Sequence, residues 1–513
     1  MPSARIKPRC LVVGAGSAGL AAVREALAAG LDPIAYEASA GCGGAWRYDP
    51  DPQQCIVRFD NEGWATFLGP DETDADADPA RPTRSALSPM YPSLRTNVPT
   101  SLMQYRGCPF PPEVGLFPSH AQVQAYLEAY AEDLLPNIKY NHRVTCIRHT
   151  TPADSDPALG HPRRRWFAEI SPIDGTAGPF TEQFDCVMVA NGHYSKPYVP
   201  WTEGLASWSR ELLHARWYRT AEAFRNKTVL VVGNSASGYD ITRELAGLVH
   251  SQRTEHEPRD DRPLKKVYQS ARSPSKLGIP FDAPDAPEWA REITVVPAIR
   301  RISNHLVTFE DGTSRDDIDT IIFATGYYFT FPFLRASDAP WDDHPVTRPP
   351  PTPTSTSTST SQLSTAPVDG GLRLHHLDDR HLFYLPDPTI AFLCLPYLVI
   401  PFPLAQLQAR LASLHFVNHP QLPKPLDFVP GISEDEPETR ESVVVGHPGQ
   451  YDLMDRMMRE SGDIPTTSTV KQADKPGMAR NDREGNDVYG ETTQAERDLR
   501  TGAKALRRAV LGY

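Results

Sequence analysis

The chain has 513 residues, too many for one compact domain, so two to four domains are expected. Hydrophobic residues make up 40% of the chain and charged residues 23%, which allows a sizeable core and excludes a chain disordered throughout. Acidic residues outnumber basic ones, 64 against 52, and the net charge of −12 argues against a broad nucleic-acid-binding surface.

Strand-like and helix-like segments alternate along the chain. A predicted strand at residues 10–13 leads through a glycine-rich turn into a helix at about 18–29, and a second strand ends at Glu37. Ser119 and Gln122 have the spacing of a capping box, ahead of apolar residues that share one helical face: Val123, Tyr126, Leu127, Tyr130 and Leu134. Later segments predict buried strands at 184–192, 228–233, 267–270 and 319–327, a helix near 239–249 and a hairpin at 305–313.

The strand at 228–233 restarts the pattern of the first strand, because it too leads through glycines into a helix and then a strand. This repeated unit predicts an α/β protein with two doubly wound, Rossmann-like dinucleotide-binding domains. Residues 70–88 and 349–367 are acidic or low in complexity, with several prolines, and we expect solvated surface loops there. The last seventy or so residues are weakly patterned until a terminal helix expected at 495–510, and no function is assigned to them.

Two further patterns bear on the compartment. The most apolar long stretch, residues 390–405, has 16 residues and three prolines, whereas a membrane-spanning helix needs about 20 apolar residues, so we expect buried core and a soluble protein. The seven cysteines form no CxxC motif and their number is odd, which disfavours a zinc ribbon, a redox disulfide and a secreted disulfide scaffold. Since no signal peptide is recognisable, a cytoplasmic location is expected.

The first glycine loop contains Gly14, Gly16, Ser17 and Gly19 and fits the dinucleotide fingerprint of tight turn, close backbone approach to a pyrophosphate and close helix–strand packing. The helix behind it supplies N–H groups and the positive end of a dipole. Glu37 ends the next strand, where a carboxylate accepts hydrogen bonds from a ribose diol and repels a 2′-phosphate. The loop therefore predicts FAD or NAD, against the alternative of a tight turn with a surface acid.

A second glycine loop has a serine in place of the middle glycine and contains Gly233, Ser235, Ser237 and Gly238. No acid follows its second strand; Arg272 lies there among serines, and a guanidinium can bind a phosphate with two hydrogen bonds. The second loop therefore predicts NADP. The alternatives are that Arg272 is an exposed solvated charge, or that Lys265 or Lys266 is the phosphate partner.

Two dinucleotide sites in one chain indicate electron transfer between a nicotinamide and a flavin, and the cysteine spacing removes a dithiol as the partner. An ordered set of motifs adds to this pattern: GAGSAG at 14–19, GGAW at 43–46, YPSLRTNVP at 91–99, HARWY at 214–218, GNSASGYDI at 233–241, ATGY at 324–327, PFP at 401–403 and QAR at 408–410. The set covers roughly residues 10–415 and resembles the flavin-containing monooxygenases, a family of class B flavoprotein monooxygenases, in their soluble fungal form.

The resemblance implies a larger FAD domain interrupted by a smaller NADPH domain. The FAD domain would comprise residues 1–212 and 318–430, with the strand at 319–327 returning the chain to it. The NADPH domain would comprise residues 213–317, and residues 431–513 would form a C-terminal extension.

The resemblance also implies cofactor contacts. Glu37 would hold the FAD ribose, Ala45 and Trp46 would lie along the flavin, and Thr96 and Asn97 would lie where flavin and nicotinamide meet. Further cofactor-binding residues are expected at Gly44, Leu94, Thr325 and Gly326. Asn97 is the catalytic candidate, because its amide offers two donors and an acceptor without a titrating proton. The alternative is that Asn97 belongs to a turn before Pro99, where asparagine is common.

One motif departs from the family pattern. An aromatic-x-glycine-x-x-x-histidine motif becomes Trp208, Arg210 and His214, and an arginine requires a different backbone conformation if the family's glycine has a positive φ. We therefore expect a shifted linker. His214 is either a proton shuttle or a hydrogen-bonded linker residue. Tyr218 stands where Baeyer–Villiger relatives carry tryptophan, which favours the monooxygenase branch.

The implied activity is an NADPH- and O2-dependent oxygenation of a sulfur or nitrogen atom in a small molecule. NADPH would reduce FAD, O2 would add at flavin C4a to give a hydroperoxyflavin, and the terminal oxygen would pass to the substrate. Three alternatives stay open: a Baeyer–Villiger oxygenase, an N-hydroxylase of amino-acid side chains, and a flavin redox sensor without oxygenation. No metal, nucleic acid or membrane partner is expected, a homodimer stays open, and the sequence does not name the substrate.

Overall fold

The computed structural model describes residues 7–70, 88–150, 165–173, 177–254, 264–275, 280–281, 283–351, 370–433, 436–464, 480–481, 487–488 and 490–512. The predicted surface loops at 70–88 and 349–367 lie almost entirely outside these described residues, so those two predictions are not tested.

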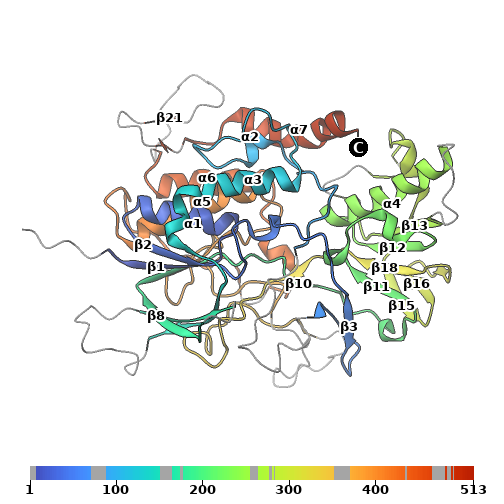
Figure 1. Cartoon of the computed structure of the whole chain (residues 1–513), viewed down its shortest axis with the longest axis horizontal. Coiled ribbons are helices and arrows are strands. Elements are labelled where there is room, and N and C mark those ends of the chain that lie inside the picture. Colours follow the sequence, from blue (N-terminus) through green and yellow to red (C-terminus); the bar gives the residue numbers. More distant parts are fainter. Residues whose placement is uncertain are drawn as a thin grey trace, which may run out of the picture.

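The first sheet has five parallel strands in the order β20-β9-β1-β2-β5 (Figure 1). They are β1 (Arg9–Val13), β2 (Asp32–Tyr36), β5 (Ile138–Lys139), β9 (Cys186–Val189) and β20 (Ile390–Phe392). Leu11 of the central strand lies between Ile34 and Val187. The central strands are buried on both faces, as their nearly continuous apolar runs predict for a parallel sheet.

Helices cover one face of this sheet, and Figure 1 shows them grouped above it. They are α1 (Ser17–Ala28), α2 (Thr100–Met103), α3 (His120–Ala131), α5 (Pro401–Phe416) and α6 (Gly449–Glu460). The capping box predicted from Ser119 and Gln122 is confirmed at the start of α3. The apolar stretch at 390–405 is confirmed as core: it contains β20 and the first turn of α5, where a proline is tolerated at the helix start.

An antiparallel sheet covers the opposite face. It consists of β6 (His142–His149), β7 (Trp166–Pro172) and β8 (Phe180–Phe184). Its buried side chains, among them Trp166 and Phe184, pack against Leu11, Val187 and Val189 of the parallel sheet. The first domain therefore has three layers, with helices, a parallel sheet and an antiparallel sheet in turn.

The second sheet also has five parallel strands, in the order β11-β18-β12-β13-β14. They are β11 (Glu211–His214), β12 (Thr228–Val232), β13 (Lys266–Ser270), β14 (Ile293–Val296) and β18 (Thr320–Phe323). Helix α4 (Ala236–Thr254) packs on one face through Ile241, Leu245 and Val249. The other face carries β15 (Ile299–Ser303), β16 (Leu306–Phe309) and β17 (Ser314–Arg315), and β16 with β17 confirms the predicted hairpin.

The second sheet is inserted into the first, because its strands occupy residues 211–323, between β9 and β20. This confirms the predicted fold of two Rossmann-like units, one inside the other. One detail of the prediction is wrong. The strand at 319–327 does not return the chain to the first domain, because β18 pairs with β11 and β12 inside the second sheet. Its four buried apolar residues would fit either sheet, and only long-range pairing decides between them.

The two sheets meet where the chain leaves β9 and β18. Beyond these strands, β10 (Lys196–Pro197) and β19 (Tyr327–Tyr328) form a short antiparallel pair. The pair joins the carboxyl ends of β9 and β18, so the carboxyl edges of both parallel sheets lead to one junction. A hairpin of β3 (Ile56–Phe59) and β4 (Ala65–Leu68) packs nearby, with Phe67 against Phe323.

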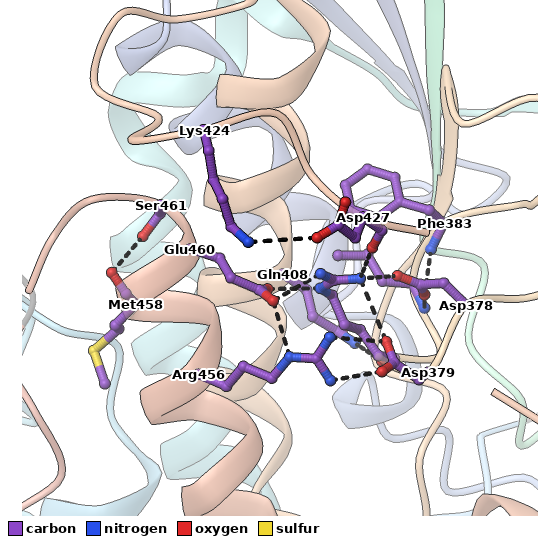
Figure 2. Close-up of polar contacts among 12 residues, drawn as sticks. Asp378, Asp379, Phe383, Gln408, Lys424, Asp427, Arg456, Met458, Glu460 and Ser461 are labelled. Atoms are coloured by element: carbon purple, nitrogen blue, oxygen red, sulfur yellow. Dashed lines mark hydrogen bonds and ion pairs between the residues drawn. The ribbon is translucent and has the colours of Figure 1, made fainter. Parts of the chain in front are cut away.

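The C-terminal segment, residues 436–512 where described, packs on both domains. Figure 2 shows how α6 is held: Arg456 of α6 forms an ion pair with Asp379 of the first domain. Glu460 of α6 also pairs with Arg380 of the first domain. The predicted terminal helix is confirmed as α7 (Gln494–Leu511). Near its start Arg497 pairs with Asp455 of α6, and near its end Arg508 pairs with Asp285 of the second domain. A short strand pair, β21 (Arg480–Asn481) with β22 (Asp487–Val488), precedes α7.

Within the described part of the chain, no helix has both the length and the apolar character needed to cross a lipid bilayer.

Candidate functional site at the junction of the two sheets

The first glycine loop has the geometry that the fingerprint requires. Gly14 has φ +95°, and a Cβ there would lie 2.9 Å from the carbonyl oxygen of Ala190. A Cβ on Gly19 would lie 2.0 Å from the carbonyl oxygen of Gly14, so α1 can pack this closely only with a glycine. Gly16 is the N-cap of α1 and has no side chain with which to cap it.

The first turn of α1 is therefore open to a ligand. The backbone N–H groups of Ser17 and Ala18 have no acceptor among the residues that the structure describes. Uncapped N–H groups and the positive end of the helix dipole favour an anion at this position. The residues present thus fit the pyrophosphate of a dinucleotide.

Glu37 lies directly beside this loop. Its Oε2 accepts a hydrogen bond from the N–H of Ala15 at 2.7 Å, and its Oε1 accepts from the N–H and the hydroxyl of Ser39 at 2.8 and 2.7 Å. The residue is only 9% exposed. These donors fix the carboxylate at the carboxyl end of β2, where a ribose is expected.

The turn that contains Gly44, Ala45 and Trp46 crosses the first glycine loop. Gly44 has φ +55°, and a Cβ there would lie 3.0 Å from the Cα of Gly16. The ring of Trp46 packs edge-on against Phe402 with centroids 6.2 Å apart. The structure therefore brings this turn next to the loop; its contact with a flavin stays a prediction.

The second glycine loop repeats the constraints of the first. Gly233 has φ +104°, and a Cβ there would lie 2.6 Å from the carbonyl oxygen of Ala324. A Cβ on Gly238 would lie 2.1 Å from the carbonyl oxygen of Gly233. Ser235, in place of the middle glycine, is exposed and has no positive φ, so the substitution causes no backbone strain. Ser237 follows in the first turn of α4 and is half-buried.

The three cations proposed for a 2′-phosphate lie at opposite ends of β13. Arg272 follows the carboxyl end of β13, on the edge that carries the glycine loop, and it is exposed. Lys265 and Lys266 are at the amino end, where Lys265 pairs with Asp319 and Lys266 donates to the hydroxyl of Tyr268. Geometry thus favours Arg272 over both lysines.

The segment that carries Asn97 joins the two domains. On its N-terminal side, the hydroxyl of Tyr91 donates to Asp240 of α4 at 2.9 Å, and Leu94 packs in the core of the second domain. On its C-terminal side, Leu102 and Met103 pack in the core of the first domain. Asn97 lies between these two anchors and is half-buried.

The Asn97 amide is not used by the turn around it. Its side chain has no hydrogen-bond partner in the described part of the chain, whereas the hydroxyl of Thr96 donates to the carbonyl oxygen of Val98 at 2.9 Å. An asparagine that served only the turn would make such a local bond itself. The Asn97 amide is therefore available to a ligand, and its catalytic role stays a prediction.

His214 is a fixed hydrogen-bonding residue. Its Nδ1 accepts from the N–H of Arg216 at 3.2 Å, so the proton is on Nε2, which donates to the carbonyl oxygen of Gly326 at 3.0 Å. Burial lowers the pKa of His214 to about 3, so the ring stays neutral near neutral pH. These contacts favour the hydrogen-bonded interpretation over the proton shuttle.

Arg210, expected to shift the linker, has no positive φ and donates to the carbonyl oxygens of Asp316 and Ile318.

Sequence reasoning missed His193 and Tyr194, which follow the carboxyl end of β9. His193 is 7% exposed, and neither ring nitrogen has a hydrogen-bond partner in the described part of the chain. Burial lowers its pKa to about 4, and the rings of Tyr194, Phe329 and Tyr397 surround it. Tyr194 is 45% exposed, and its ring packs on that of Tyr327 with centroids 5.5 Å apart. Their position just beyond a buried parallel strand was the available signal.

Among the residues that the structure describes, no group of histidine, cysteine, aspartate and glutamate side chains is arranged to hold a metal ion.

Known proteins resemble this chain in sequence and in structure. A family model described as flavin-binding monooxygenase-like matches residues 7–59, 81–252 and 285–343. The thiol-specific monooxygenase of Saccharomyces cerevisiae is 31% identical over 336 residues, which are 63% of this chain. The match spans 64% of that protein's length, which is less than two thirds. The flavin-containing monooxygenase FMO GS-OX-like 2 of Arabidopsis thaliana is 28% identical over 80% of this chain and 74% of its own length. The S-allyl-L-cysteine S-oxygenase of Allium sativum shares the fold, with a TM-score of 0.65 and 21% identity over 98% of this chain and 94% of that one.

Proposed function

We propose, since this chain belongs to the flavin-binding monooxygenase-like family, that it is an FAD- and NADPH-dependent monooxygenase acting on a sulfur or nitrogen atom of a small molecule. One oxygen atom of O2 would enter the substrate and the other would leave as water, with two electrons supplied by NADPH. A flavin is the family's cofactor; FAD as the flavin and NADPH as the reductant are parts of the proposal.

One observation carries this proposal: two glycine loops lie at the carboxyl edges of two parallel sheets, and both edges lead to one junction. An acid, Glu37, lies beside the first loop, and a cation, Arg272, follows the strand beside the second. A carboxylate repels a 2′-phosphate, whereas a guanidinium binds it, so the two edges suit different dinucleotides. Asn97 lies on the segment that spans the junction between them.

Each of these residues has a distinct task in the proposal. When bound, the flavin would supply hydride uptake from NADPH and oxygen transfer by way of its C4a atom. The first turn of α1 would hold the FAD pyrophosphate and Glu37 would accept from the ribose, while Arg272 would bind the 2′-phosphate. Asn97 would offer hydrogen bonds to the reacting oxygen without a proton that titrates near neutral pH. The packed junction would limit the access of water, which wastes oxidant as hydrogen peroxide.

Sulfur is the first candidate atom, because two of the similar proteins are named for thiol and S-oxygenation. A panel of thiols, thioethers, amines and ketones tests the proposal, with product counted per NADPH consumed. Sulfur or nitrogen oxides are expected. Esters formed from ketones would instead establish a Baeyer–Villiger oxygenase, and NADPH consumption with hydrogen peroxide alone across the whole panel would favour the redox-sensing alternative.

The variant Asn97→Ala tests the role of the junction asparagine. We expect FAD-loaded protein in which product per NADPH falls at least about tenfold and hydrogen peroxide rises to match. Removing about 1.4 kcal/mol of stabilisation from the oxygen-transfer step changes the ratio of product to hydrogen peroxide by that factor. Asn61→Ala is the matched control, since Asn61 is exposed in the turn between β3 and β4. An unchanged product yield in Asn97→Ala would remove Asn97 from the proposal.

A further inference from the structure

Arg440 belongs to the C-terminal segment and reaches the turn after β18. Its two terminal nitrogens donate to the carbonyl oxygens of Thr325 and Tyr327, each at 2.7 Å. The carbonyl oxygen between them, that of Gly326, accepts from Nε2 of His214. Two side chains from distant parts of the sequence thus hold three consecutive carbonyl groups.

The turn and the arginine fit each other sterically. Gly326 has φ +83°, and a Cβ there would lie 2.7 Å from one terminal nitrogen of Arg440. The guanidinium lies over the ring of Tyr198, 4.6 Å from its centroid, and 5.8 Å from that of Tyr397. A planar fork that donates to two carbonyls while stacking on aromatic rings is a contact that arginine makes and lysine does not.

No carboxylate of the described residues pairs with Arg440, and its Nε–H is buried without an acceptor there. This distinguishes it from the arginines around α6, which form ion pairs with carboxylates: Arg380 pairs with Glu460, and Arg456 pairs with Asp379 (Figure 2). The contacts of Arg440 are therefore directed at the shape of one turn and do not serve to neutralise charge.

Arg440 is attached to the first domain. The short helix Arg440–Val443 is fixed there by the N–H of Tyr397, which donates to the carbonyl oxygen of Val443 at 2.9 Å. The turn that it holds directly follows β18 of the second domain and leads into β19. Arg440 thus fixes the exit of one sheet against the other, at the junction where the two cofactors are proposed to meet.

We propose that Arg440 is a positioning residue, which holds the Thr325–Gly326–Tyr327 turn in the alignment that hydride transfer from NADPH to the flavin requires. The inference rests on the proposed function. Arg440 lies in the C-terminal segment, beyond residue 343, where the match to the family model ends. A displacement of about 1 Å at such a junction can cost a hundredfold in rate, which is why the geometry of one turn matters.

Arg440→Met and Arg440→Lys, made in the full-length FAD-loaded protein, test this inference, with Arg456→Met as the control. We expect both Arg440 variants to keep FAD and to bind NADP⁺ with a Kd within about threefold of the unmodified protein. Anaerobic reduction of the flavin at saturating NADPH should fall at least about tenfold in both, because methionine donates no hydrogen bond and lysine replaces the rigid planar fork with a flexible point charge. Arg456→Met should lower Tm but leave the rate per FAD-loaded molecule unchanged.

A second readout needs no cofactor. Hydrogen–deuterium exchange of the amides at residues 324–328 should be faster in both Arg440 variants and unchanged in Arg456→Met. A wild-type reduction rate in Arg440→Lys and Arg440→Met, or equal losses of rate in Arg440→Met and Arg456→Met, would overturn the inference. If Arg440→Met fails to fold, the rate and exchange in Arg440→Lys decide. If NADPH does not reduce the flavin of the unmodified protein, the proposed function fails, whatever Arg440 does.

Discussion

At the scale of single residues, the side chains around each glycine loop account for the difference between the two nucleotide sites. Glu37 is held rigidly by three hydrogen bonds beside the first loop, so a negative charge is fixed where a ribose would lie. Arg272 is exposed at the corresponding edge of the second sheet, while the rival lysines are engaged at the other edge. We therefore expect the first loop to disfavour a nucleotide that carries a 2′-phosphate and the second loop to prefer one.

The variant Arg272→Ala tests this expectation. A hydrogen bond to a charged group contributes about 1.5–3 kcal/mol, so the KM for NADPH should rise roughly tenfold to a hundredfold while the KM for NADH stays unchanged. Steady-state kinetics with both nucleotides gives the comparison, and Lys265→Ala serves as the control at the opposite end of β13. Equal effects of Arg272→Ala on NADPH and NADH would contradict the phosphate assignment.

At the scale of elements, the local patterns predicted what they can encode. The glycine spacing and the apolar runs predicted the strands and helices around both loops, and the capping box at Ser119 predicted the start of α3. They did not predict that β18 pairs inside the second sheet, because a buried run of four apolar residues carries no record of its partner. Arg440 was missed for a similar reason: it lies in a weakly patterned segment, and its partners are more than 100 residues earlier in the chain.

The two strand–loop–helix units can be separated by substitutions at equivalent glycines. In Gly19→Ala and Gly238→Ala the new Cβ would meet a backbone carbonyl oxygen at about 2 Å, which forces the helix away from its loop. Gly19→Ala should lose the visible absorbance of bound flavin. Gly238→Ala should stay yellow, but NADPH should no longer reduce its flavin.

Gly247→Ala is the matched control for these two variants. Gly247 lies in α4 with open space around its Cβ position, and alanine is the better helix former by up to about 1 kcal/mol. It should therefore keep both functions and unfold at an equal or higher Tm. Loss of flavin from Gly238→Ala, or retention of a flavin that NADPH reduces in Gly19→Ala, would contradict the assignment of one cofactor to each loop.

At the scale of the whole molecule, the C-terminal segment connects both domains over the same side that carries the helices. Helix α6 is fixed to the first domain by ion pairs, and α7 runs from α6 to the second domain, where its end lies near α4 in Figure 1. Together with the β10–β19 pair and Arg440, these contacts tie the two sheets at several points. This arrangement suits a reaction in which two bound cofactors must keep one geometry.

The central claim is that this protein transfers an oxygen atom from O2 to its substrate at the expense of NADPH. The most direct test is turnover of the FAD-loaded enzyme with NADPH and its best thiol or thioether under ¹⁸O2, followed by mass spectrometry of the product. The account predicts one ¹⁸O atom in each product molecule and one NADPH oxidised for each product formed in coupled turnover. A product without ¹⁸O, or purified protein that remains colourless and cannot be loaded with flavin, would contradict it.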